Sequence, residues 1–278
     1  GLVGSEMCIR DSIVEELNKA YHIATTGRRG PVLIDLPMNI QRSEVENPVY
    51  DMTFEDKHTD AAAAQQAADT ILEALEQAKR PVIMLGHGVD SSFSQQKLIR
   101  FAQKRQIPII TSVLAKSVLG YDHPLNFGCI GGAYGHRYAN MIANAKSDLL
   151  LCFGISLCTR QIGTKVHEFA RGAKIIRIDI DPYNLQRDIH ENGINEVKLQ
   201  AETGAVIDCL AKAAAPDTEG ISDWLNVCTE IKENLQAVDD ATPERYPNRM
   251  IADLSDMLED TSAIAVDVGQ HMVLSLIH

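Results

Sequence analysis

Short apolar runs alternate with amphipathic stretches through the middle of the chain. Four runs are apolar at nearly every position, a pattern typical of strands that are buried on both faces of a sheet. They are PVIML at 81–85, IPIIT at 107–111, DLLLCF at 148–153 and KIIRIDI at 174–180, and a weaker run, EVKL, lies at 196–199. Apolar residues at helical spacing between and around them predict helices at about 61–79, 93–104, 137–146, 163–171 and 203–214.

This alternation predicts the fold class. Parallel strands need crossover connections, and right-handed helical crossovers cover both faces of the sheet that they build. We therefore expect an α/β fold with a doubly wound parallel sheet over residues 61–215.

The flanks differ from this central domain. A helical pattern at 13–26 and the apolar run PVLIDLP at 31–37 predict a helix followed by a buried strand. Two further helices, at 223–236 and about 247–259, precede AIAVDV at 263–268, which reads as a strand. Partial α/β domains are thus predicted on both sides of the central one, at 13–41 and 223–273, with polar linkers at 42–60 and 216–222.

Both ends of the chain lack a helical or strand period. Residues 1–12 (GLVGSEMCIRDS) and 274–278 (LSLIH) resemble translated sequencing-adapter sequence. We interpret both as non-native ends, the alternative being ordinary frayed termini, and assign no function to either.

Composition excludes several classes of protein. The net charge of −12 disfavours nucleic acid as a partner, and no run of 18 apolar residues predicts a membrane span. The six cysteines form no C-x-x-C pair and the histidines have no metal-ligand spacing, so no metal site is predicted. Free thiols in apolar stretches favour a reducing, cytoplasmic location.

Glycine-rich loops are the first candidates for a binding site. Gly86 and Gly88 follow the run at 81–85, where glycines let a phosphate approach the N–H groups of a following helix. Gly131 and Gly132 lie in the loop GCIGGAYGHR, whose many glycines suit close approach of a ligand. The alternatives are a plain tight turn for the first loop and a flexible surface loop for the second.

Charged residues near strand ends extend this candidate site. Asp179 and Asp181 close the run at 174–180, where an acid can hold ribose hydroxyls or cap the segment that begins at Pro182. Arg160, after the run at 148–153, can meet a nucleotide phosphate or lie solvated in its loop.

Three segments resemble thiamine-diphosphate-dependent enzymes. GRRGPVLIDLPMNIQ resembles the end of their pyrimidine-binding domain, RPVIMLGHGV through GAKIIRIDID the central domain of acetolactate synthase, and PNRMIADLSDMLEDTSAIAVDVGQH the opening of the diphosphate-binding domain. Their order and spacing agree with the family over about residues 13–271. The chain is therefore expected to be a fragment of an acetolactate-synthase-like large subunit.

The resemblance implies a 2-keto-acid carboligase or decarboxylase, a transferase or lyase that uses thiamine diphosphate and Mg²⁺. By matching D-V-G-Q-H, Gly269, Gln270 and His271 are implied to reach the diphosphate. The catalytic glutamate and the Mg²⁺-binding GDG motif have no counterpart in this chain, so no catalytic or metal residue is assigned and the fragment is expected to be inactive.

The central domain of acetolactate synthases also binds FAD as a structural cofactor. FAD is accordingly a candidate ligand here, with another nucleotide or an empty site as alternatives. The matching positions are Gly86, Gly88, Gly131, Gly132, Gly154, Arg160, Asp179 and Asp181.

Other functions stay open at this point. Within the family the alternatives are oxalyl-CoA-, benzoylformate- or sulfoacetaldehyde-type enzymes, and outside it a non-catalytic nucleotide-binding module. The resemblance implies a small 2-keto acid as substrate and a homo-oligomer, dimer or tetramer, for the full-length protein.

Overall fold

The computed structural model describes residues 12–45, 48, 50, 53–54, 60–89, 91–132, 135–190, 193, 195–213, 219–241, 247–259, 262, 264–267 and 269. The chain divides into two compact units, Gly1–His58 and Thr59–His278. The expectations for residues 1–11 and 274–278 lie outside the described residues.

The first unit contains α1 (Ile13–Thr25) and the short α2 (Met38–Gln41). Between them the run at 31–37 forms no strand, and Leu33 is 89% exposed. The prediction of a buried strand there is wrong. An extended segment must pair its N–H and C=O groups, and this unit has no strand among its described residues to pair with it.

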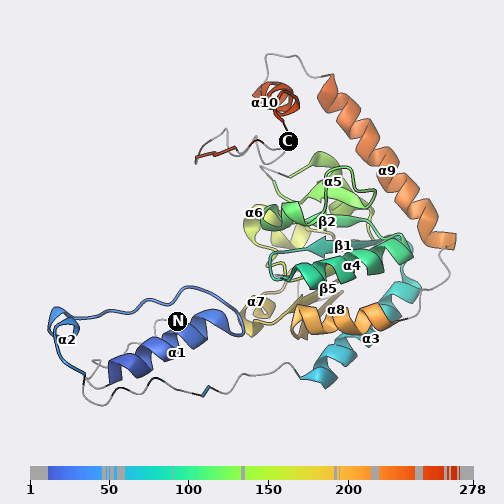
Figure 1. Ribbon diagram of the computed structural model, residues 1–278. Coiled ribbons are helices and arrows are strands. Elements are labelled where there is room, and N and C mark those ends of the chain that lie inside the picture. Colours follow the sequence, from blue (N-terminus) through green and yellow to red (C-terminus); the bar gives the residue numbers. More distant parts are fainter. Residues whose placement is uncertain are drawn as a thin grey trace. The chain divides into compact units, whose positions relative to one another are not determined.

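The second unit is built on one sheet of six parallel strands (Figure 1). The strands lie in the order β3-β2-β1-β4-β5-β6, so the chain winds outward in one direction from β1 and then in the other from β4. This confirms the predicted doubly wound fold. The strands are β1 (Pro81–Leu85), β2 (Ile109–Thr111), β3 (Asn126–Cys129), β4 (Leu149–Phe153), β5 (Lys174–Asp179) and β6 (Glu196–Gln200).

Helices cover both faces of this sheet. The α-helices of the described part of this unit are α3 (Ala61–Gln77), α4 (Ser92–Arg105), α5 (Arg137–Met141), α6 (Thr159–Ile162), α7 (Pro182–Gln186), α8 (Thr203–Lys212), α9 (Glu219–Asp240) and α10 (Pro247–Asp256). Shorter turns are the 3₁₀ helices η2 (Val113–Val118) and η4 (Val166–Glu168) and the π-helix η3 (Ile142–Lys146).

Successive side chains of the central strands β1 and β4 pack into different cores on the two faces of the sheet. Ile83 and Leu85 of β1 pack with α3, α4 and α8, whereas Val82 and Met84 pack on the opposite face with α5, η3 and α9. All five β1 residues are buried, as their uninterrupted apolar pattern predicted.

Helix α9 contributes directly to the second of these cores. Its Trp224 and Cys228 are buried, and the Trp224 indole N–H donates a 3.0 Å hydrogen bond to the carbonyl oxygen of Pro81, the first residue of β1. This helix therefore packs against the sheet along the face that holds Val82 and Met84.

A buried ion pair joins β5 to β6. Arg177 Nη1 lies 2.7 Å from Glu196 Oε1, and the two side chains are only 2% and 0% exposed. Arg177 also donates to the carbonyl oxygens of Asn184 and Arg187, and Glu196 Oε2 accepts from the Ile189 N–H at 2.9 Å. The pair thus holds the segment that connects the two strands.

Two other expectations for secondary structure are wrong. The helix predicted at 163–171 is replaced by η4 and turns, because Gly163 (φ 88°) ends α6 and Ala170 (φ 47°) adopts a left-handed conformation. In the run predicted as a strand at 263–268, the described residues 264–267 form no strand, and no described strand pairs with them.

Candidate functional site

The carboxyl ends of β1 and β4 meet at the point where the strand order reverses. The Gly86 N–H donates to the Phe153 oxygen and the Gly88 N–H to the Gly154 oxygen, both at 2.9 Å. A Cβ atom on Gly86 would lie 2.1 Å from the Gly154 oxygen, and Gly154 has φ +56°. The contact between the two loops is therefore enough to require these glycines, and ligand binding at the first loop stays a prediction.

The loop after β3 folds back on itself and lies beside the loop after β4. Gly131 exchanges hydrogen bonds with the Asn140 amide, at 3.3 Å and 2.8 Å, and a Cβ on Gly135 would lie 2.3 Å from the Gly131 nitrogen. The Gly132 N–H donates to the Arg160 carbonyl oxygen at 3.2 Å. The structure thus brings together two loops that the sequence identified separately.

Arg160 lies in the short helix α6. Its side chain is exposed, and its guanidinium makes no hydrogen bond or ion pair with the described residues. A guanidinium in this position remains available to an anionic group that approaches the carboxyl edge of the sheet.

Asp179 and Asp181 both have local roles after β5. The Asp179 carboxylate accepts from the Asp181 N–H at 2.9 Å and from the Asn184 amide at 3.2 Å. Asp181 caps α7 by accepting from the Tyr183 N–H at 2.9 Å, with Pro182 in the first turn. The capping alternative is therefore confirmed for Asp181. Both side chains are half-buried, and ribose binding by either stays a prediction.

The residues expected to reach thiamine diphosphate lie near the end of the chain. Gly269 forms a bend, and Gln270 and His271 lie outside the described residues. Their role stays a prediction.

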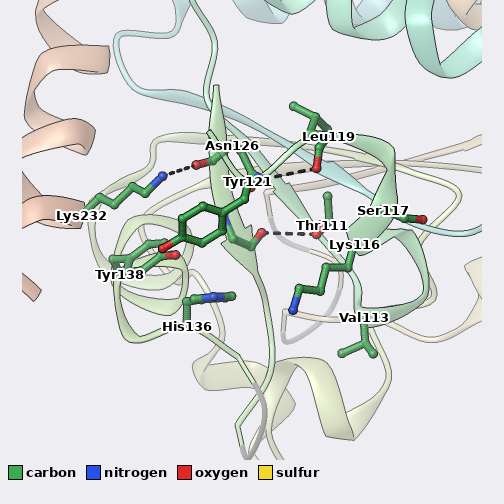
Figure 2. A pocket seen from close by; sticks show the side chains of 11 residues that line it. Thr111, Val113, Lys116, Ser117, Leu119, Tyr121, Asn126, His136, Tyr138 and Lys232 are labelled. Carbon is green, nitrogen blue, oxygen red and sulfur yellow. Dashed lines mark hydrogen bonds between the residues drawn. The ribbon is translucent and has the colours of Figure 1, made fainter. Parts of the chain in front are cut away.

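A pocket that the sequence did not indicate lies beside β2 and β3 (Figure 2). Its volume is about 360 Å³, within the roughly 300–1,000 Å³ typical of small-molecule sites. None of the individually assigned site residues lines it, although Gly128 and His136 of the candidate loop GCIGGAYGHR do. The full lining is Thr111, Val113, Lys116, Ser117, Leu119, Tyr121, Asn126, Gly128, His136, Tyr138 and Lys232. Helix α9 supplies Lys232, which is why spacing along the sequence gave no signal for this pocket.

Several general expectations can be compared with the described residues. Among them no group of three His, Cys, Asp or Glu side chains could hold a metal ion, and no helix is long and apolar enough to cross a membrane. The five cysteines among the described residues are free thiols; of the three in apolar stretches, Cys152 and Cys228 are buried, whereas Cys209 is only half-buried. Burial raises the pKa of the Cys152 thiol to about 12, so it stays protonated at neutral pH.

Comparison with known proteins identifies the family. The model of the thiamine pyrophosphate enzyme central domain matches residues 68–210, about half of the chain and the whole of the sheet described above. The chain belongs to the thiamine pyrophosphate enzymes. The matched residues of this family extend from α3 to α8 and include every strand of the sheet.

Relatives within the thiamine pyrophosphate enzymes support an acetolactate-synthase-like member. A probable acetolactate synthase large subunit from Methanocaldococcus jannaschii is 31% identical over 95% of this chain and 45% of its own length. An acetolactate synthase large subunit from Corynebacterium glutamicum is 30% identical over 95% and 42%. A glyoxylate carboligase from Escherichia coli O157:H7 is 35% identical over 62% and 28%. The chain spans less than half the length of these relatives.

Proposed function

We propose that this chain is part of an acetolactate-synthase-like enzyme that joins or decarboxylates 2-keto acids. The observation that carries the proposal is its similarity to two acetolactate synthase large subunits at 30% and 31% identity over 95% of the chain. This similarity extends beyond the central domain into both flanks.

Thiamine diphosphate, when bound, supplies the electron sink that decarboxylation of a 2-keto acid needs. From this chain we propose Gly269, Gln270 and His271 as residues that approach the diphosphate, with Mg²⁺ held by residues elsewhere in the full-length enzyme. The support is the match of their segment to the family pattern D-V-G-Q-H.

We propose a nucleotide, with FAD as the first candidate, along the carboxyl edge of the sheet. The residues fit such a ligand, because the loops after β1, β3 and β4 meet there and the side chain of Arg160, whose backbone carbonyl bonds to Gly132, is exposed. The Arg160 side chain is proposed to hold a phosphate, and Asp179 to orient the sugar end from β5.

Flavin titration tests this part of the proposal. Changing Arg160 to alanine is expected to weaken FAD binding by about 1.5–3 kcal/mol, the contribution of one charge-assisted hydrogen bond. The free energy of unfolding should change by less than about 0.5 kcal/mol, because the side chain is exposed. Equal FAD affinity of wild type and variant would remove Arg160 from the site, and an absence of binding by wild type would remove FAD.

Catalysis is tested by release of CO₂. With pyruvate, thiamine diphosphate, Mg²⁺ and FAD, we expect no CO₂ above the blank from the 278-residue chain and clear turnover from a reading frame extended to the length of its relatives. Lack of turnover of any 2-keto acid by the extended protein would contradict the proposal.

Glyoxylate is a second candidate substrate. The 35% identity to a glyoxylate carboligase favours it, although that similarity covers 62% of the chain rather than 95%. The same CO₂ assay with glyoxylate in place of pyruvate distinguishes the two candidates by their relative kcat/KM.

A further inference from the structure

The pocket beside β2 and β3 has the charge of an anion-binding site. Its lining includes the ammonium groups of Lys116 and Lys232 and, among the described residues, no carboxylate. The whole chain has a net charge of −12, so the positive charge of the pocket lining is opposite in sign to that of the chain. Figure 2 shows the two lysines reaching toward the pocket from different sides, Lys116 from η2 and Lys232 from α9.

Lys232 is fixed in place by the strand and by aromatic rings. Its Nζ donates a 3.0 Å hydrogen bond to the Asn126 carbonyl oxygen and lies 5.7 Å from the centre of the Tyr121 ring and 6.0 Å from that of Tyr138. An ammonium group has three donors, and the Asn126 bond engages one of them. The lysine is therefore pre-oriented, with donors left for a ligand.

Burial disfavours the charged form of both lysine side chains relative to water. It lowers the pKa of Lys116 and of Lys232, and the nearby Asp122 carboxylate offsets part of this effect for Lys232. A ligand that brings a negative charge into the pocket would restore part of the electrostatic stabilisation that burial removes from these ammonium groups.

The remaining walls suit an organic molecule rather than a bare ion. Val113, Leu119 and the ring of Tyr138 provide apolar surface, and the hydroxyl oxygen of Thr111 supplies a polar contact at the end of β2. A volume of about 360 Å³ holds a ligand larger than a single phosphate.

We propose that this pocket binds a small organic anion, whose acid group is attracted by the ammonium groups of Lys116 and Lys232 and whose apolar part lies against Tyr138 and Leu119. The ligand contacts both α9 and the sheet, so binding also stabilises the packing of α9. The proposal is independent of thiamine diphosphate chemistry, because the residues that line the pocket come from β2, η2, β3, α5, α9 and the loops between them.

Calorimetric titration with 3-phenylpropanoate tests this inference, because this probe has an acid group and a ring but no keto group that could react. We expect saturable binding at low ionic strength and none of the neutral 3-phenylpropan-1-ol, which has the same shape. Lys116→Met and Lys232→Met should each weaken binding about tenfold or more, the effect of one charge-assisted hydrogen bond. Lys97→Met is the matched control, because Lys97 is a partly buried lysine of α4 that pairs with Asp208.

Further measurements separate the charge from the fold. Lys232→Arg keeps the positive charge and should retain most of the affinity for the anion. If Lys232→Met disturbs the packing of α9 on the sheet, Lys116→Met still tests the role of charge, because Lys116 lies on η2. Inorganic phosphate with the same lysine dependence would assign the site to phosphate-bearing ligands. Even a weak site, with a binding free energy of about 4 kcal/mol, would fill at an anion concentration of roughly 10 mM. The proposal is overturned if the wild type binds neither anion at that concentration. It is also overturned if Lys97→Met weakens binding as much as the pocket variants do.

Discussion

The ion pair between Arg177 and Glu196 gives the sharpest test of the energetics described here. Changing Glu196 to alanine removes the carboxylate that lies 2.7 Å from Arg177 and leaves the guanidinium, 2% exposed, without its counter-charge. Breaking a buried pair in this way costs about 3–5 kcal/mol, because an uncompensated charge stays out of water. The Ile189 N–H also loses its acceptor, which favours the upper part of that range.

Urea unfolding followed by circular dichroism measures this loss. A cost of about 3–5 kcal/mol is a large share of the roughly 5–15 kcal/mol that stabilise a typical domain. The midpoint should therefore fall markedly, and the difference should change little with added salt, because buried pairs are weakly screened.

A surface pair provides the control. Lys97 and Asp208 lie equally close, at 2.7 Å, but their side chains are 23% and 47% exposed. Asp208→Ala should cost less than about 1 kcal/mol, and salt should reduce that cost. If Glu196→Ala costs no more than Asp208→Ala, the argument that burial sets the size of the effect is refuted.

Two further predictions concern a glycine and the thiols. Gly154→Ala should destabilise the protein by about 2–5 kcal/mol, because the residue has φ +56° and its new Cβ would lie 2.6 Å from Gly88. Gly120→Ala is the control, because its new Cβ would meet nothing within 4 Å. In the same urea assay it should change the free energy of unfolding by less than about 0.5 kcal/mol. At pH 8 Cys152, with a thiol pKa of about 12, has roughly one thiolate in ten thousand and should resist iodoacetamide, whereas the half-buried Cys158 should react. Since burial raises the pKa of Cys152, its reactivity should rise as the pH approaches 12. Mass spectrometry measures the labelling of each cysteine. Rapid labelling of Cys152 at pH 8 in the folded protein would contradict the prediction.

The sequence predicted most of the sheet because burial on both faces leaves a strong pattern. PVIML is apolar throughout and DLLLCF is apolar after its first residue, and the apolar residues of both became central strands that are buried at every position. The strand Asn126–Cys129 was missed because it is short, lies at the sheet edge and has a glycine and an asparagine at its half-buried positions. Its polar positions match a loop as well as a strand.

The wrong predictions of a helix and of a strand have different causes. The apolar residues of GTKVHEFAR have helical spacing, but Gly163 and Ala170 take left-handed conformations that interrupt a helix. The run at 31–37 is apolar enough for a strand, yet a strand also needs a neighbour, which local pattern does not reveal. The hydrophobic periodicity of a segment therefore shows which side chains it can bury, but it does not show whether another element of the fold packs against them.

The candidate site was predictable only in part. Glycine loops after apolar runs were visible in the sequence, although the reason for Gly86 and Gly154 proved to be contact between two loops. The pocket was not visible, because Lys232 and Asn126 are 106 positions apart and meet only once α9 packs beside β3.

The buried indole on α9 gives this protein its own optical reporter. Trp224 is the single tryptophan of the chain, is 4% exposed and is hydrogen-bonded to the first residue of β1. Its fluorescence therefore originates from one known position, the junction between a long helix and the central strand. Separation of that helix would move the indole into water and shift its emission to longer wavelength while the backbone signal of the sheet persists. Two spectroscopic signals recorded on one unmodified sample can thus distinguish release of the helix from loss of the sheet.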